Sequence, residues 1–433
     1  MKIRICNNSF NYIVLFLIMC LELQVFYLVP TTWSLFGMDY QMICALIEVG
    51  LFIVWIIKKQ GIIVKGRYHW IIVTGLLLVV TSSIAGMISY NQSFINGLVL
   101  QRNRIANFLF YFVIYSWYKE GKITITGIKK LLIVFVTTCA AVYFLQYILS
   151  HVVIFTYSTA STKIRYGSIR FWFNTVYMVV VSGMALNNLM RKKNKVCKNL
   201  IYMILPVAVI ILITKSRTAA LSVVAALLVC FLLHRESGKK KIIGICAVIL
   251  GFFIFSSTSV GQDLLNVFST GTSQEDTLTV RELGRAYYVA KTSEQPLSFL
   301  MGCGYATSTN SSALNTAYPT LYSSAYGYKV MYYPQDNGIF GQFFFYGILG
   351  IIWWGAILGL FIRKGYKIYK TSGNTLFIFF AIYEIGMSIT SIPVLFGSKV
   401  LISFMIIFLA NSENCIAYED NRRINERMEK WKK

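Results

Sequence analysis

The sequence predicts an all-α polytopic membrane protein with about twelve transmembrane helices and one large extracytoplasmic loop. The chain of 433 residues is 56% hydrophobic and only 13% charged, and its mean hydropathy is +0.61; soluble domains do not have this composition. Apolar runs long enough to cross a bilayer, roughly 20 residues each, recur along nearly the whole chain. Lys and Arg are dense in every second connecting segment, as expected for loops that alternate between two sides of a membrane.

The predicted spans are 11–30, 39–57, 70–90, 103–118, 131–150, 171–190, 199–214, 217–234, 241–258, 337–362, 375–392 and 398–412. The first follows Lys2 and Arg4 and lacks a small-residue cleavage site, so we expect a retained helix and not a signal peptide. The fourth begins beside Arg102 and Arg104, whose side chains are expected to extend toward lipid headgroups; binding of phosphate by these outward cations is the alternative.

The spans divide the chain into residues 1–258 with nine helices, the loop 259–336, residues 337–412 with three helices, and the tail 413–433. Both termini and alternate loops hold most of the 41 Lys and Arg residues. This bias predicts cytoplasmic termini and an outer position for 259–336. The tail is either a basic helix on the inner leaflet or a frayed polar end. The net charge of +24 then reflects topology and the lipid bilayer, and no nucleic acid partner is expected.

The sequence contains no motif for a metal or a nucleotide. The three histidines lie on separate loops without the spacing of zinc ligands, and the nine cysteines form no disulfide framework. The fragment "GCG" at 302–304 is too short to identify a nucleotide site. The predicted cytoplasmic loops are too short to fold into a nucleotide-binding domain. We therefore expect no cofactor and look for chemistry at the outer face.

The loop 259–336 is too long to be a simple connection and is expected to be functional. Its first half predicts a helix at about 278–292, on which Arg281 and Arg285 share one face. Its second half is rich in tyrosine, and rings of this kind stack on the apolar faces of sugars. An interfacial aromatic belt is the alternative. The candidate sugar-binding residues are Tyr322, Tyr326 and Tyr333.

Residues 214–221, "TKSRTAAL", form a short turn between two apolar runs. The predicted topology places this turn outside, so topology does not explain Lys215 and Arg217. Arg217 lies at the start of a helix, where free amide groups and the helix dipole favour an anion. The planar fork of an arginine suits phosphate oxygens. Arg165 is a further outward cation.

Acidic residues support two different predictions. Asp336 lies at the mouth of the predicted span 337–362, where a carboxylate can take a proton from a hydroxyl group; it can also cap that helix. Glu22, Glu48 and Glu384 fall inside spans. Intramembrane carboxylates are functional candidates, so these three keep a transporter open as an alternative.

Three segments, in order, resemble the O-antigen polymerase and ligase family of bacterial surface-polysaccharide assembly. "KSRTAALSVVAALLV" is similar to the start of a middle span of the family. "VRELGRAYYVAKTSEQPLSFLMGCGY" looks like its outer-loop segment, and "DNGIFGQFFFYGILG" is similar to the start of the next span. The matching positions are Arg281, Pro296, Gly302, Gly304, Asn337, Gly347 and Gly350. The ligase pattern has a histidine where this chain has Asp336, a departure that favours a polymerase. A carboxylate is already anionic at neutral pH.

The resemblance implies a metal-independent glycosyltransferase of GT-C-like architecture in the cytoplasmic membrane of a bacterium. It would join undecaprenyl-diphosphate-linked oligosaccharide repeat units into capsule, exopolysaccharide or O-antigen. Ligation of finished glycan to another acceptor is one alternative, and a flippase or exporter of lipid-linked oligosaccharide is another. A chain-length regulator and a flippase are the implied protein partners. The implied roles are catalysis by Asp336, Arg281 and Arg285, and diphosphate binding by Arg217, Lys215, Arg281, Arg285 and Arg165.

Overall fold

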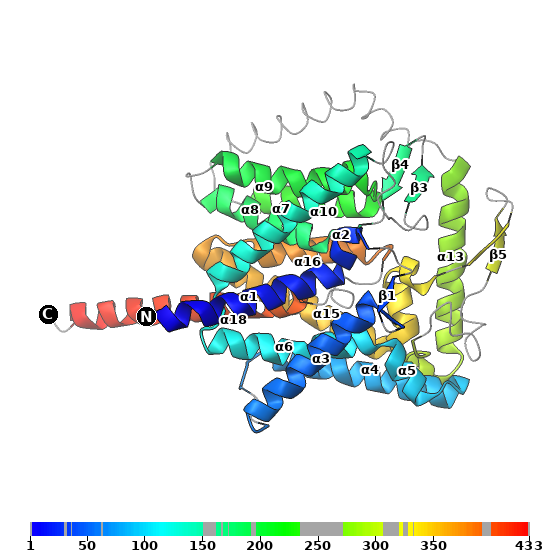
Figure 1. The fold of residues 1–433 in the computed structure, drawn as a ribbon, viewed down its shortest axis with the longest axis horizontal. Helices are drawn as coiled ribbons and strands as arrows, with labels where there is room; N and C mark the ends of the chain where they lie inside the picture. Colours follow the sequence, from blue (N-terminus) through cyan, green and yellow to red (C-terminus); the bar gives the residue numbers. More distant parts are fainter. Residues whose placement is uncertain are drawn as a thin grey trace.

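The computed structural model describes most of the chain as helices that run along a common direction. It describes residues 2–29, 33–35, 37–61, 64–149, 162–165, 168–171, 173–191, 196–233, 272–305, 320–323, 328–331, 333–391 and 400–431. Both ends of the chain lie at one end of the bundle, which we call the terminal end (Figure 1). Helix α13 (Thr272–Ser293) stands across the other end, which we call the α13 end.

The bundle follows the order of the predicted spans. Its helices are α1 (Lys2–Glu22), α2 (Gln24–Tyr27), α3 (Tyr40–Lys58), α4 (His69–Tyr90), α5 (Phe94–Leu100), α6 (Arg102–Lys119), α7 (Ile125–Leu149), α8 (Val176–Arg191), α9 (Val196–Ala208), η2 (Val209–Ile213), α10 (Arg217–Leu233), α15 (Ile339–Ser372), α16 (Leu376–Met387) and α18 (Leu401–Trp431). A helix occurs at every predicted span except 241–258, which lies outside the described residues. The fold is therefore that of a multi-pass helical membrane protein.

Five helical segments in the described part of the chain are long and apolar enough to cross a membrane. They are Tyr40–Lys58, His69–Tyr90, Ile125–Leu149, Val196–Ile213 and Ile339–Ser372. The other apolar helices are shorter, such as Arg217–Leu233 and Leu376–Met387. Helix α6 is in neither group, and it carries Arg102, Arg104 and Lys119. Length and composition thus support a polytopic protein without fixing the number of spans at twelve.

Three antiparallel hairpins of two strands each lie toward the α13 end (Figure 1). They pair β1 (Ser34–Leu35) with β2 (Met38–Asp39), β3 (Thr162–Arg165) with β4 (Ser168–Phe171), and β5 (Thr320–Ser323) with β6 (Tyr328–Met331). Asp39 also caps α3, because its side chain accepts a 2.7 Å hydrogen bond from the Met42 amide.

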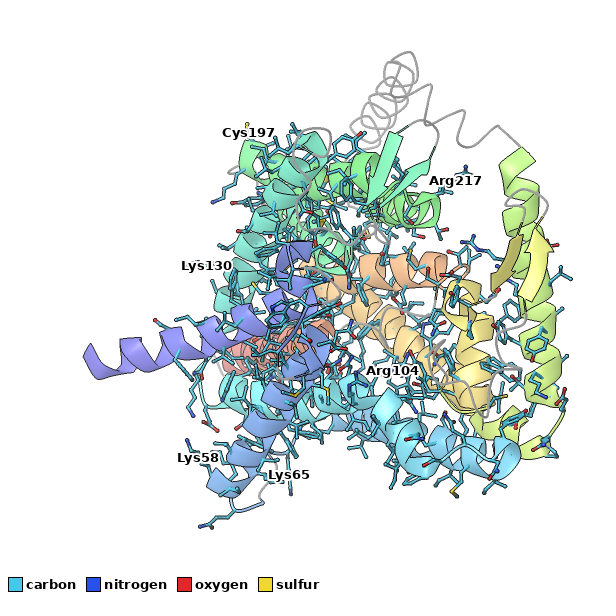
Figure 2. All side chains as sticks on the ribbon, turned by 45° about the vertical axis from the view of Figure 1, so that its right-hand side comes forward. Lys58, Lys65, Arg104, Lys130, Cys197 and Arg217 are labelled. Atoms are coloured by element: carbon cyan, nitrogen blue, oxygen red, sulfur yellow. The ribbon has the colours of Figure 1, made fainter. Side chains whose placement is uncertain are left out.

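The terminal end is tied together by ion pairs. Glu120, after α6, bonds Lys59 at 2.8 Å and Lys122 at 2.6 Å. Glu413, on α18, bonds Lys364 of α15 at 2.7 Å and Arg67 at 3.4 Å. Figure 2 shows Lys58, Lys65 and Lys130 toward the same end, and Arg217 toward the opposite one. The segments predicted to be most basic therefore gather with the termini.

Helices α9 and α15 are irregular near the α13 end. Helix α9 contains Pro206 and continues as the π-helix η2. Helix α15 is broken at Gly347, whose φ of 61° and ψ of −160° suit glycine alone. Breaks of this kind in membrane helices are tolerated where neighbouring groups bond the freed backbone.

Candidate active site at the α13 end

Helix α13 confirms the helix predicted at about 278–292 and lies against α15. Tyr288 is fully buried, with its ring centroid 4.7 Å from that of Phe344. Gly284 packs so closely on the residues before α15 that a Cβ there would lie 3.1 Å from Asn337 Nδ2. Arg281 and Arg285 lie three residues before and one residue after Gly284, so both flank this contact face.

The side chain of Arg285 reaches the end of a bundle helix. Its Nη2 donates a 2.8 Å hydrogen bond to the carbonyl oxygen of Ile389, just beyond α16. Its guanidinium also lies 5.5 Å from the ring centroid of Phe340. Its Nε is buried without a hydrogen-bond partner among the described residues. A half-buried arginine that keeps an unused donor is suited to an anionic ligand.

The end of α16 joins two further helix starts. The Ile339 amide donates a 2.8 Å hydrogen bond to Ser388 O, which fixes the start of α15. The hydroxyls of Thr390 and Thr218 lie 2.9 Å apart, which fixes the start of α10. Residues 388–390 therefore bring Thr218, next to Arg217, close to the contact made by Arg285.

The turn "TKSRTAAL" separates its two cations. Lys215 adopts a left-handed φ of 48°, and its Nζ lies 5.9 Å from the ring centroid of Tyr147 on α7. Ser216 precedes α10, where its carbonyl accepts the Ala220 amide at 2.9 Å. Arg217 is the first residue of α10 and points toward the α13 end in Figure 2.

Asp336 lies in the short 3₁₀ helix η4 (Pro334–Asn337) that precedes α15. Its side chain is exposed, whereas Asn337 is buried. Asn337 Nδ2 donates a 2.9 Å bond to Tyr333 O, and its Oδ1 is buried without a hydrogen-bond partner among the described residues. The N-cap position of α15 is held by Gly338. The alternative that Asp336 is the N-cap of this helix is therefore wrong, because the N-cap lies two residues later.

The glycine pair "GCG" packs on the break in α15. A Cβ at Gly302 would lie 2.3 Å from Phe345 O, and the Cys303 amide donates a 2.7 Å bond to Phe344 O. The hydroxyl of Ser82, on α4, donates a 2.5 Å bond to Phe345 O. The "GCG" segment and the start of α15, some 40 residues apart in the sequence, are thus in direct contact. The carbonyls of Phe344 and Phe345, next to the break, both accept hydrogen bonds.

Other predicted residues are placed less closely together. Tyr333 is 42% exposed beside η4. Arg165 ends β3, paired with Ser168, and Tyr322 lies in β5, paired with Lys329. Tyr326 lies outside the described residues.

Lys291, also on α13, bonds Glu294 at 2.7 Å. This hydrogen bond, working against burial, raises the pKa of Lys291. Lys291 is thus engaged by Glu294, whereas Arg285 bonds Ile389.

The sequence did not identify every residue of this region. The expectation that Arg104 extends to headgroups is wrong, because its guanidinium lies 4.4 Å from the ring centroid of Tyr305. Arg102 instead pairs with Asp39 at 3.8 Å. The sequence gives only a weak signal for Arg104, since Gln101, Arg102, Asn103 and Arg104 form one polar run at the start of the helix.

An apolar groove lies along α9, η2 and α10. Its volume is about 290 Å³. Its lining is aliphatic throughout and consists of Met203, Ile204, Val207, Ala208, Ile211, Leu212 and Leu227. The groove lies on the two helices that the turn "TKSRTAAL" joins.

The fold is that of a multi-pass membrane protein in which Arg217 and Arg285 lie toward the α13 end of the helix bundle. Residues 201–355, from α9 into α15, match the family model described as O-antigen ligase. This match confirms the predicted resemblance to the O-antigen polymerase and ligase family. Members of that family are glycosyltransferase-like enzymes that act on lipid-linked glycans. No curated protein matches the chain.

Proposed function

We propose that the protein is a polymerase that joins undecaprenyl-diphosphate-linked oligosaccharide repeat units on the outer face of a bacterial cytoplasmic membrane. The observation that carries the proposal is the junction at residues 388–390. There Ile389 accepts the hydrogen bond from the guanidinium of Arg285, and Thr390 contacts Thr218 at the start of α10, next to Arg217. A helix N-terminus and two arginines at one place favour a diphosphate.

The chemistry follows from the leaving group. The acceptor hydroxyl oxygen attacks the anomeric carbon of the donor sugar, and the bond from that carbon to the diphosphate oxygen breaks. Undecaprenyl diphosphate leaves with the electron pair. Arg217, Arg281 and Arg285 stabilise the developing negative charge, since fixed cations act most strongly where charge grows in the transition state. Lys215 and Arg165 add positive charge at the same end.

Asp336 takes the proton of the acceptor hydroxyl in this proposal. It is exposed on η4, directly before the buried Asn337 that touches α13 at Gly284. A positioned carboxylate of this kind contributes roughly 10²–10⁴-fold to a rate. Tyr322, Tyr326 and Tyr333 are assigned to sugar contacts, because aromatic rings stack on pyranose faces.

The lipid tail is assigned to the apolar groove between α9, η2 and α10. The groove is lined by aliphatic side chains alone and is adjacent in the chain to Lys215 and Arg217. A tail in this groove would deliver its diphosphate to the turn. The terminal end, with its basic loops, is assigned to the cytoplasm by the positive-inside rule.

Two other functions have specific support. The matched family model is described as O-antigen ligase, so transfer of finished glycan to another acceptor is the second candidate. A flippase draws support from Glu48 and Glu384, which are fully buried inside helices of the bundle. Against the flippase, Glu22 accepts a hydrogen bond from Tyr177 and joins α1 to α8.

One assay separates the three functions. Purified protein in liposomes receives lipid-linked repeat units alone. Polymer means a polymerase, movement of the lipid without a new bond means a flippase, and product only after a second acceptor is added means a ligase. In a polymerase-deficient strain, Arg217→Ala, Arg281→Ala and Asp336→Ala should leave single repeat units; normal polymer from all three at normal expression would show the site to be elsewhere. A chain-length regulator and a flippase are proposed partners.

A further inference from the structure

Arg104 lies between two aromatic side chains that border the break in α15. Its Nη1 donates a hydrogen bond to the Tyr346 hydroxyl. Its guanidinium carbon lies 4.4 Å from the ring centroid of Tyr305 and 5.3 Å from that of Tyr346. One guanidinium thus contacts the residue before Gly347 and the residue after Gly304.

The contact is reinforced by neighbours on the same helix ends. Tyr346 is fully buried, and its hydroxyl donates a 2.6 Å bond to Gln101 Oε1, one turn from Arg104. Gln92 Nε2 donates a 2.9 Å bond to Tyr305 O. The segment from α4 to α6 therefore holds both sides of the contact between residues 302–305 and α15.

The direction of the first part of α15 depends on this contact. Because Gly347 interrupts the helix, residues 339–346 are not aligned by the rest of α15. Their position is set by bonds such as that from the Cys303 amide to Phe344 O. The 3₁₀ helix with Asp336 directly precedes them.

We propose that Arg104 is a positioning residue for the transfer reaction. By holding Tyr346 and Tyr305, it fixes the break in α15 and so places Asp336 beside the arginines of α13. The role rests on the proposed function. Arginine suits it because a planar guanidinium can bond a hydroxyl and stack on rings at the same time, which a lysine cannot.

The first test measures geometry without using activity. Cys303 is fully buried within the held segment, and burial raises the pKa of its thiol, so N-ethylmaleimide should modify it slowly in the purified protein. In Arg104→Gln the modification of Cys303, followed by peptide mass spectrometry, should be about tenfold faster because local opening exposes the thiol. Arg102→Gln is the matched control and should react as the wild type does, since Arg102 pairs with Asp39.

The second test measures the reaction. Arg104→Gln should lower kcat for polymer formation by about 10²-fold, the cost of a misplaced catalytic group, with KM for the donor unchanged within about twofold. Arg104→Lys should recover part of this loss. If Arg104→Gln fails to fold, Tyr346→Phe, which removes only the hydroxyl that Arg104 bonds, is used in both tests instead.

The outcomes separate the two proposals. Equal rates of Cys303 modification in Arg104→Gln and wild type would refute the proposal that Arg104 fixes the break in α15. Rapid modification with an unchanged kcat would refute the positioning role. Absence of polymer from wild-type protein would refute the polymerase, while the modification rates would still decide whether Arg104 holds the break.

Discussion

The guanidinium of Arg285 donates a 2.8 Å hydrogen bond to the carbonyl oxygen of Ile389. This bond links the helix that crosses the α13 end to the end of α16. Thr390, the next residue, contacts Thr218 at the start of α10. A cation on α13 is thereby held at a fixed place, which a flexible loop would not provide.

Arg285→Lys should lower the rate of polymer formation almost as much as Arg285→Ala. A lysine ammonium is compact and lacks the planar fork of a guanidinium, so its donors cannot reach Ile389 O and a diphosphate in the same geometry. We expect a loss of about 10²–10³-fold, as for removal of a preorganised electrostatic donor. The measurement is the consumption of lipid-linked repeat units. Lys291→Gln, on the same helix, should stay within about twofold of wild type, and a fully active Arg285→Lys would remove Arg285 from the site.

Asp336→Asn should lose about 10²–10⁴-fold in kcat, because an amide cannot accept the hydroxyl proton. The substitution keeps the size of an exposed side chain, so the melting temperature should change little. Asp336→Glu should retain more activity than Asp336→Asn. If the asparagine variant were as active as the aspartate, proton transfer would have to be assigned to another group.

Gly347→Ala should destabilise the purified protein by about 3 kcal/mol, since the backbone conformation is one that only glycine adopts readily. In addition, the new Cβ would lie 2.5 Å from the Leu300 carbonyl carbon. Gly355→Ala, eight residues further along α15, meets nothing within 4 Å and should be neutral or slightly stabilising. Thermal unfolding in detergent compares them; equal melting temperatures would argue against the break.

Lowering the pH should weaken the terminal end through Glu120. Burial alone would raise the pKa of this carboxyl, but hydrogen bonds from Lys122, Lys59 and Ser116 outweigh it and lower the pKa to about 2. A lowered pKa in the folded state means that the stabilisation is complete above the ordinary value of roughly 4.5 and is lost as the pH falls toward 2.

Glu120→Gln should therefore be less stable than wild type at neutral pH, and the difference should shrink between about pH 4.5 and pH 2. Melting temperatures across this range measure it. Glu282→Gln removes an exposed carboxylate of α13 and serves as the control. A difference between Glu120→Gln and wild type that stays constant with pH would exclude Glu120 as the titrating group.

Filling the apolar groove should affect only long-tailed donors. Val207→Trp places a bulky side chain in the groove and should raise KM for the natural donor about tenfold, equivalent to about 1.4 kcal/mol. A donor with a short isoprenoid tail should be unaffected. Ile201→Trp, exposed on α9 outside the groove lining, is the matched control. An equal effect on both donors would place the tail elsewhere.

The sequence predicted the parts of the fold that depend on local pattern. Apolar runs predicted the positions of the bundle helices, and the spacing of polar residues predicted α13. The bond from Arg285 to Ile389 could not be predicted, because its acceptor is a main-chain carbonyl more than 100 residues away. Likewise, the side chain of a charged residue at the start of an apolar run can extend to the lipid headgroups or pack inside the protein. Only the contacts with Tyr305 and Tyr346 show that the side chain of Arg104 packs inside the protein.

The bonds from Ser82, Gln92 and Arg104 to the region around the α15 break come from a part of the chain that lies before the family match at 201–355. Chimeras that exchange only the matched segment between relatives would lose these partners. A chimera that takes its glycan specificity from a relative should therefore need α4, α5 and α6 of that relative as well as its residues 201–355. Substitutions in these two regions should occur together among relatives.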